Sequence, residues 1–273
     1  MQKSFLKLSN ISASVLMMSV ILVLMRTALL IFGFDFETSF FKNDALAYLL
    51  YALLIVVSLV SFTMSRNISP VSITPPKKTL TDVLVSLATI IFICFFVIYV
   101  VKATEFFAPA SYERNPLKAV SIILCLPASA LSAVYYALRL FSTKEKGILL
   151  SLFAVSPVIF LSALLLERFA TVSASAASLS HFPDIISLLI LAFFILAEGK
   201  AFIPTNRKTS IIPCSFVTFT ALVFSAVPDL LTLIIGRNTL NFEGILFLIL
   251  KTVFAVYVVT NTILMARDMK ETK

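Results

Sequence analysis

The stretch between residues 11 and 33, ISASVLMMSVILVLMRTALLIFG, decides the class of this protein. Arg26 is its only charged residue. A helix of this length crosses a hydrocarbon core of ~30 Å at about 1.5 Å per residue. The run is too long for the core of a secretory signal peptide, and no A-x-A cleavage site ends it. We therefore predict an uncleaved first transmembrane helix.

Similar apolar stretches recur along the whole chain. Of the 273 residues, 60% are hydrophobic and 13% are charged, and the mean hydropathy is +1.04; a soluble domain carries about 25% charged residues. The apolar runs are continuous, whereas the strands of a membrane barrel alternate. We predict an all-α membrane protein, a polytopic bundle of about eight transmembrane helices that forms a single integral membrane domain, 1–273. The predicted spans are 11–33, 44–65, 81–103, 118–141, 147–167, 183–199, 210–236 and 244–266.

The basic loop residues predict the orientation, because cytoplasmic loops are enriched in Lys and Arg. With the N-terminus inside, 6 basic loop residues lie outside: Lys42, Lys102, Arg114, Lys118, Arg168 and Arg237. The other 14 lie inside: Lys3, Lys7, Arg66, Lys77, Lys78, Arg139, Lys144, Lys146, Lys200, Arg207, Lys208, Arg267, Lys270 and Lys273. We expect both termini to be cytoplasmic and the protein to lie in the cell (plasma or cytoplasmic) membrane. The net charge of +8 is spread over short loops, so it does not predict nucleic-acid binding.

The glycines and prolines occupy distinct positions in the predicted helices. All five glycines lie at or next to predicted helix ends, where glycine commonly terminates a helix. Three prolines, Pro127, Pro157 and Pro228, fall in mid-span. Each frees a backbone carbonyl and bends its helix. We interpret them as bends that pack well, with a gating hinge as the alternative.

The order of features in the two halves of the chain suggests a 4+4 parallel duplication. Asp44 opens the second span and Asp184 opens the sixth. The string AVY occurs in the fourth span, at 133–135, and in the eighth, at 255–257. Four helices per half would relate the halves by an axis along the membrane normal. The matches are short, and the duplication stays an open alternative.

Three charged residues lie within predicted spans, where a charge is costly unless it is paired or hydrated. Arg26, Asp229 and Lys251 each lie seven residues from the outer end of their span. This places all three in one layer ~10 Å below the outer boundary. We favour a structural ion pair between Asp229 and Lys251, with Arg26 extending toward the outer surface.

The functional alternative is an outward-facing ligand-binding pocket formed by the same layer. One acid and two bases would give it a net charge of +1, which suits a small anionic solute or a lipid headgroup. Tyr51, Ser129 and Ser225 are candidate lining residues at similar depth. Glu198, Lys200, Asn261 and Thr262 are interpreted as ordinary boundary residues.

No pattern in the sequence points to a metal, a cofactor or a catalytic site. His181 is the only histidine, and Cys94, Cys125 and Cys214 lie inside apolar segments without CxxC spacing. Catalytic motifs such as HExxH and GxSxG are missing, so we expect the protein not to be an enzyme.

Two classes of function remain. We favour a permease-like or solute- or lipid-binding membrane component, because several helices carry charges and prolines at depth. The alternative is a non-transporting membrane scaffold, sensor or assembly subunit with a protein partner. That alternative fits the absence of glycine-broken helices in the predicted spans. In both cases the partner common to every span is the lipid bilayer.

Overall fold

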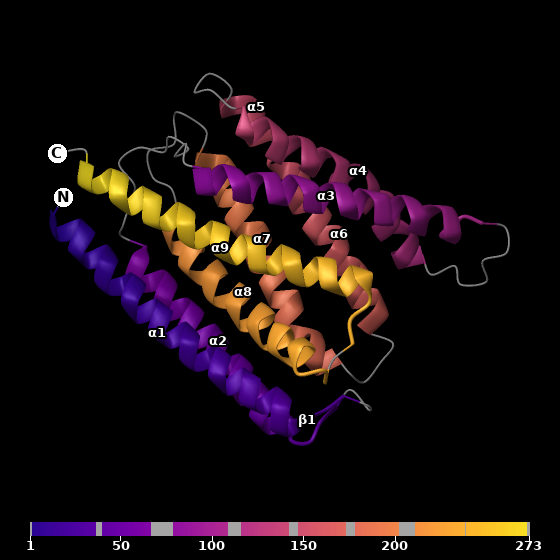
Figure 1. Cartoon of the computed structure of the whole chain (residues 1–273), viewed down its shortest axis with the longest axis horizontal. Helices are drawn as coiled ribbons and strands as arrows, with labels where there is room; N and C mark the ends of the chain where they lie inside the picture. Colours follow the sequence, from indigo (N-terminus) through magenta and orange to yellow (C-terminus); the bar gives the residue numbers. More distant parts are fainter. Residues whose placement is uncertain are drawn as a thin grey trace.

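The computed structural model describes residues 2–36, 40–66, 79–108, 116–141, 147–172, 178–201, 211–237 and 239–271. Within them, eight helical segments are long and apolar enough to cross a membrane. The chain is therefore a multi-pass membrane protein built as an α-helical bundle (Figure 1). Several loop residues used for the orientation lie outside the described residues, namely Lys77, Lys78, Arg114, Lys144, Lys146, Arg207, Lys208 and Lys273.

The observed helices match the predicted spans closely in the middle and extend beyond most of them at the ends. The second span, 44–65, has the predicted bounds, whereas the first helix begins nine residues before the predicted position 11. The elements are α1 Gln2–Gly33, β1 Phe34–Asp35, β2 Phe40–Phe41, α2 Asp44–Ser65, α3 Thr79–Phe106, α4 Pro116–Leu140, α5 Gly147–Phe153, α6 Val155–Val172, α7 Ser178–Ala201, α8 Ile211–Ile234 and α9 Phe242–Glu271.

A short antiparallel hairpin joins the first two helices. Phe34 pairs with Phe41 and Asp35 with Phe40. We call this end of the bundle the hairpin side. The opposite end, where both chain ends lie (Figure 1), is called the terminus side.

The predicted span 147–167 has a counterpart at Ile148–Phe169, and one non-helical residue, Ala154, divides it into α5 and α6. The cause is Pro157, which has no N–H to bond to the carbonyl of Phe153. The hydroxyl of Ser156 donates to that carbonyl instead, at 2.6 Å. The proline therefore produces a true interruption here, while Pro127 and Pro228 lie within continuous helices.

Glycine plays two different roles in this fold. Gly236 ends α8 in the left-handed conformation, with φ +75°, and the amide of Arg237 donates back to the carbonyl of Thr232 at 3.0 Å. Gly199, in contrast, does not terminate its helix, because α7 continues to Ala201. A Cβ on Gly199 would lie 2.6 Å from the Cβ of Ala154. Gly199 lies near the end of α7, as predicted, and the absence of a side chain there allows α7 to approach the α5–α6 break closely.

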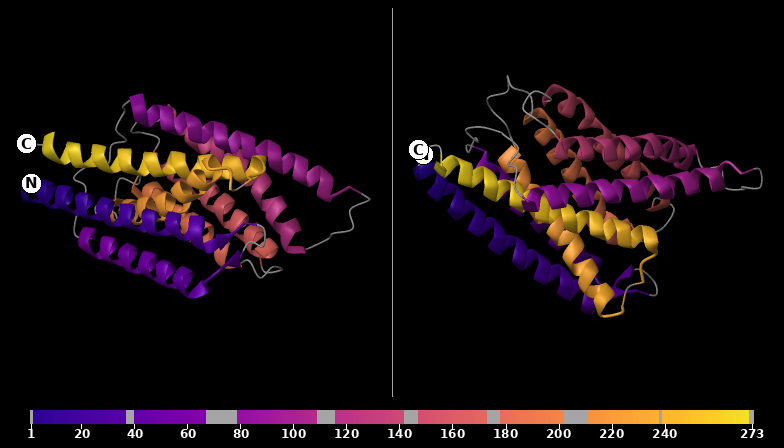
Figure 2. Two further views of the ribbon diagram at one scale, coloured as in Figure 1. Left: turned by 60° about the horizontal axis from the view of Figure 1, so that its bottom comes forward. Right: turned by 45° about the horizontal axis from the view of Figure 1, so that its top comes forward.

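The helices form two groups joined by α7 and α9 (Figures 1 and 2). In one group α1 and α2 pack against α8, and in the other α4 packs between α3 and α6. α7 contacts both α8 and α6, and α9 contacts both α8 and α3. The middle of the bundle is filled by buried aromatic side chains: Phe92, Phe95, Tyr136, Phe160, Phe194 and Phe254. The 4+4 duplication stays a prediction.

Candidate functional site

The charges predicted to share one layer come together in what we call the hairpin-side cluster: Arg26, Asp184, Ser225, Asp229 and Lys251. The guanidinium of Arg26 contacts Asp229 Oδ1 at 3.0 Å. Lys251 Nζ contacts Asp229 Oδ2 at 3.0 Å and Asp184 Oδ1 at 2.8 Å. These bonds tie α1, α7, α8 and α9 together. The structure thus joins Arg26, Asp229 and Lys251 in one network.

Arg26 is held by the backbone of α8 as well as by Asp229. Pro228 lacks the N–H that would otherwise bond to the carbonyl of Phe224. Arg26 Nη1 donates to that carbonyl at 2.5 Å and to the carbonyl of Ser225 at 2.9 Å. Its guanidinium also lies 5.1 Å from the centre of the Phe224 ring. Arg26 is buried, so the expectation that it extends to the outer surface is wrong.

Asp184 is a member of the cluster that sequence reasoning missed. It was assigned to the boundary of a span beginning at 183, but α7 begins at Ser178, which places Asp184 more than a turn inside the helix. Its Oδ1 accepts from Lys251 and, at 2.7 Å, from the hydroxyl of Ser225. Two carboxylates now face two cations, so the four charges formally sum to zero. Arg168 of α6 also acts electrostatically on Asp184, so the predicted net charge of +1 and the anionic ligand that it favours stay a prediction.

The three candidate lining residues have different surroundings. Ser225 lies in the cluster, and its hydroxyl accepts from Lys251 Nζ at 2.9 Å. Tyr51 is buried in α2, with its ring centre 5.1 Å from that of Phe182 and 6.3 Å from that of Phe224. Ser129 lies in α4, and its hydroxyl donates to the carbonyl of Leu126 in the same helix at 2.9 Å. Ser129 therefore belongs to a different part of the bundle.

A second ionic group, which we call the terminus-side cluster, contains Tyr135, Arg139, Glu198, Tyr257 and Asn261. Arg139 Nη1 lies 2.6 Å from Glu198 Oε2. Glu198 Oε1 accepts from the hydroxyl of Tyr257 at 2.5 Å and from the amide of Asn261 at 3.0 Å. The hydroxyl of Tyr135 lies 3.5 Å from Glu198 Oε2. This group ties α4, α7 and α9 together near the opposite end of the bundle.

The terminus-side cluster overturns two assignments from the sequence. Glu198 is only 1% exposed and Asn261 is equally buried, so they are not ordinary boundary residues. Arg139 was counted among the cytoplasmic loop residues, yet it is buried inside the bundle. The sequence did contain a signal for this cluster, namely polar residues spaced by four, which share a helix face. This spacing occurs in α4, at Tyr135 and Arg139, and in α9, at Tyr257 and Asn261.

Apart from Arg139 Nη1, which forms the ion pair with Glu198, two buried polar atoms near this cluster have no hydrogen-bond partner in the described part of the chain. They are the hydroxyl of Tyr136 and Oδ1 of Asn261. Tyr136 is the neighbour of Tyr135, and the centres of their rings are 4.7 Å apart. Buried polar groups in native proteins nearly always have a partner, whether protein, water or ligand. These two atoms therefore mark a place where hydrogen-bonding capacity is unused.

A third ionic group lies on the hairpin side between α3, α6 and α9. Lys102 Nζ contacts both Glu167 and Glu243 at 2.8 Å, and the hydroxyl of Tyr99 donates to Glu167 at 2.5 Å. Lys102 was predicted to be an outer-loop residue, but it lies inside α3. We call these residues the α3–α6–α9 cluster.

The ring of Phe247 contacts two cations from different helices. Its centre is 4.8 Å from Arg168 Cζ in α6 and 4.8 Å from Lys251 Nζ in α9. Such contacts stabilise a cation by about 0.5–2 kcal/mol according to how far it is desolvated. Phe247 therefore contacts both Lys251 of the hairpin-side cluster and Arg168.

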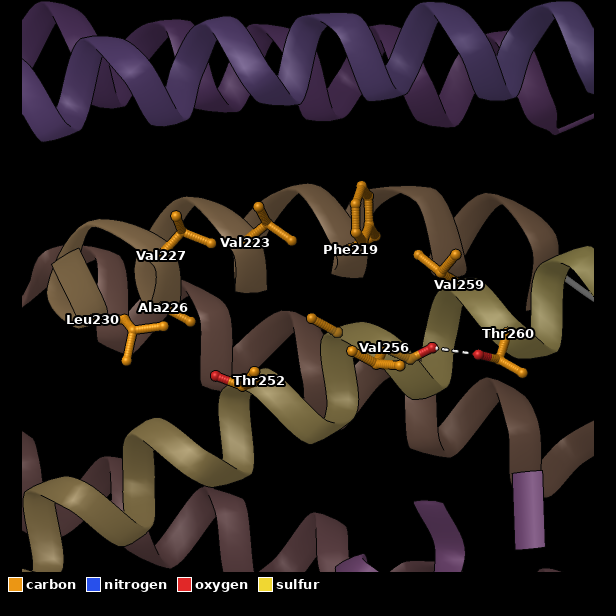
Figure 3. A pocket seen from close by; sticks show the side chains of 10 residues that line it. Phe219, Val223, Ala226, Val227, Leu230, Thr252, Val256, Val259 and Thr260 are labelled. Carbon is orange, nitrogen blue, oxygen red and sulfur yellow. Dashed lines mark hydrogen bonds between the residues drawn. The ribbon is translucent and has the colours of Figure 1, made fainter. Parts of the chain in front are cut away.

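An apolar groove of about 310 Å³ runs between α8 and α9 (Figure 3). Phe219 and Leu230 lie at its two ends on α8, opposite Thr252 and Thr260 on α9. Both threonine hydroxyls donate to carbonyls of their own helix. No charged residue lines this groove, so it suits an apolar chain and not a polar solute.

Within the described residues, no group of three or more His, Cys, Asp and Glu side chains could hold a metal ion. Comparison with protein-family models, with curated proteins and with solved structures finds no match for this chain.

Proposed function

We propose that the protein is a permease-like membrane protein in which the two ionic clusters close the opposite ends of a path for a small polar solute. One observation carries the proposal: α7 and α9 are joined to each other by buried ionic groups near both ends. Lys251 of α9 binds Asp184 of α7 on the hairpin side, and Tyr257 of α9 binds Glu198 of α7 on the terminus side.

The energetics of buried charge support this proposal. A buried ion pair is often no more stabilising than well-packed apolar residues of the same volume, because both partners lose their hydration. A bundle that needed only stability could fill both positions with leucine. Ionic and hydrogen bonds do have one property that apolar packing lacks, since each bond can be exchanged for a bond to water or to a polar solute.

The packing supports two closures in series. At the terminus-side cluster, the ring centre of Tyr257 in α9 lies 6.3 Å from that of Phe194 in α7 and 5.9 Å from that of Phe254 in the same helix. α7 and α9 also connect the two helix groups. Rocking of one group against the other would open one cluster while the other stays closed, as in alternating access.

The orientation proposed for this path follows the basic loop residues, with both termini cytoplasmic and the protein in the cell membrane. Single cysteines at Arg114 and Lys144, which both lie outside the described residues, test it. A membrane-impermeant thiol reagent should label the first from outside intact cells and the second only after lysis. Labelling of both from the same side would overturn the orientation.

Flux across liposomes tests the proposed function. Purified protein is reconstituted, and stopped-flow light scattering follows the uptake of glycerol, acetate and methylguanidinium against protein-free liposomes. We expect at least one solute to enter faster with the protein present. The double variant Asp184→Asn/Lys251→Gln removes one cation and one acid. Solute uptake should be faster with this variant than with the wild type, because the hairpin-side closure is open. Rates equal to those of empty liposomes for both proteins would overturn the proposal.

One observation favours the alternative of a non-transporting scaffold, sensor or assembly subunit. The charges of the hairpin-side cluster bond directly to one another, and the groove between α8 and α9 is lined by none of them. In that case the clusters fix the helices in register, and the groove holds a lipid chain. Mass spectrometry of gently purified protein distinguishes the two, because a scaffold should retain lipid or a protein partner and no polar solute. We propose no catalytic activity for either candidate.

A further inference from the structure

We propose that the terminus-side cluster is a binding site for an organic cation bearing a guanidinium or ammonium group, and that Arg139 occupies this site as an internal substitute for the ligand. The inference rests on the proposed function for the biological role of the cation. The binding itself is argued from the cluster alone.

The surroundings of the Arg139 guanidinium are those that recognise an organic cation. Glu198 supplies a carboxylate at 2.6 Å, and the centre of the Tyr257 ring lies 5.0 Å from Arg139 Cζ. A carboxylate combined with an aromatic face is the usual protein environment for guanidinium and ammonium ligands. The hydroxyl of Tyr135 adds a further oxygen next to Glu198.

The site has more acceptor capacity than its present bonds use. Asn261 Oδ1 can only accept, and the Tyr136 hydroxyl can accept as well as donate. Both atoms are buried without a partner in the described part of the chain. Arg139 is constrained by its tether to α4, whereas a free cation can turn its N–H donors toward these oxygens. Satisfying a buried acceptor recovers free energy that is otherwise lost to desolvation.

Arg139 is also placed where it can leave the site. It lies in the last turn of α4, which ends at Leu140. A long basic side chain near a helix end can extend to the membrane interface at modest cost. Exchange of Arg139 for a free monovalent cation leaves one positive charge beside Glu198, so the buried carboxylate keeps its partner throughout.

The experiment uses the full-length protein in nanodiscs with methylguanidinium and methylammonium as probes and methylurea as the neutral isostere. Two quantities are measured: the Tm, followed by circular dichroism, and the modification of Arg139 by phenylglyoxal, quantified by mass spectrometry. We expect a saturable rise in Tm with methylguanidinium but not with methylurea. We also expect faster modification of Arg139 when the probe is bound, because the side chain has been displaced toward the interface.

Variants separate the site from the rest of the bundle. Asn261→Ala keeps the ion pair between Arg139 and Glu198 and should weaken methylguanidinium binding roughly tenfold, the loss expected for one buried hydrogen bond. Glu198→Gln should abolish binding if it folds. Glu243→Gln, in the separate α3–α6–α9 cluster, should bind as well as the wild type and serves as the matched control.

Two results would overturn the inference. Methylurea could stabilise the protein as well as methylguanidinium does, or the wild type could fail to bind either cation. In the second case, binding of methylguanidinium by Arg139→Ala would show that Arg139 is a permanent structural partner. Saturable binding without any flux into liposomes would support the binding site and would contradict only the proposed transport.

Discussion

The hairpin-side and terminus-side clusters both join α7 to α9, but they hold their cations at different depths. Lys251 lies nine residues inside α9, and Arg26 is bound to two backbone carbonyls of α8. Arg139 lies one residue from the end of α4. The cations of the first cluster therefore lie further from their helix ends than Arg139 does. We infer that the hairpin-side cluster is anchored and that the terminus-side cluster is releasable.

The largest effect should come from removing a carboxylate of the anchored cluster. Asp229→Asn removes the carboxylate that Arg26 contacts and leaves Lys251 with Asp184 alone, and a buried charge without its partner costs about 3–5 kcal/mol. We expect severe destabilisation or failure to accumulate, measured as the Tm in a fixed detergent by circular dichroism.

The control for this variant restores the charge balance. Asp229→Asn combined with Lys251→Ala leaves one cation, Arg26, and one acid, Asp184, so part of the stability should return. Fully additive losses in the double variant would contradict direct coupling of the two residues.

The same change in the releasable cluster should cost less. Glu198→Gln keeps hydrogen-bonding capacity for Tyr257 and Asn261, and Arg139 can extend to the interface. We expect a loss of about 2 kcal/mol, below the usual range for a buried ion pair. Measurement of Arg139 modification by phenylglyoxal should show a rise in Glu198→Gln. A loss equal to that of Asp229→Asn would remove the distinction between the two clusters.

Much of the bundle could be predicted because its signals are local. A span is set by a run of apolar residues, so every predicted span has a helical counterpart in the structure. Helix ends were less accurate, since polar residues can continue a helix beyond the hydrocarbon core. The predicted start of α7 was five residues too late, and Asp184 was therefore predicted to lie at the helix end and not inside the helix.

The partners of buried charges could not be predicted fully, because they depend on which helices are neighbours. Arg26, Asp229 and Lys251 were found from depth along their own helices. Glu198 and Arg139 were missed because both lie near helix ends, where a charge normally faces water. Their burial depends on how the helices pack, and that packing is not encoded in hydropathy.

A smaller effect is expected where α7 approaches the break between α5 and α6. Gly199→Ala would place a Cβ 2.6 Å from that of Ala154, and overpacking of this kind costs about 1–2 kcal/mol. Because Gly199 follows Glu198, the displacement of α7 should also increase phenylglyoxal modification of Arg139. The double variant Gly199→Ala/Ala154→Gly relieves the contact and should recover most of the Tm. A single variant as stable as the wild type would show that the two helices can separate freely here.

The smallest expected effect is a difference in stability between alanine variants of two serines, which the sequence predicted to lie at similar depth. The hydroxyl of Ser225 bonds to Lys251 and Asp184, so Ser225→Ala removes bonds to two charged groups and should cost about 1 kcal/mol. The hydroxyl of Ser129 donates only to a carbonyl of its own helix among the described contacts, and Ser129→Ala should stay within about 0.5 kcal/mol of the wild type. Because the two changes remove the same atom, the difference in Tm measures what the charged cluster adds. Equal losses would mean that the anchored cluster does not depend on its hydroxyl and is held by the ion pairs alone.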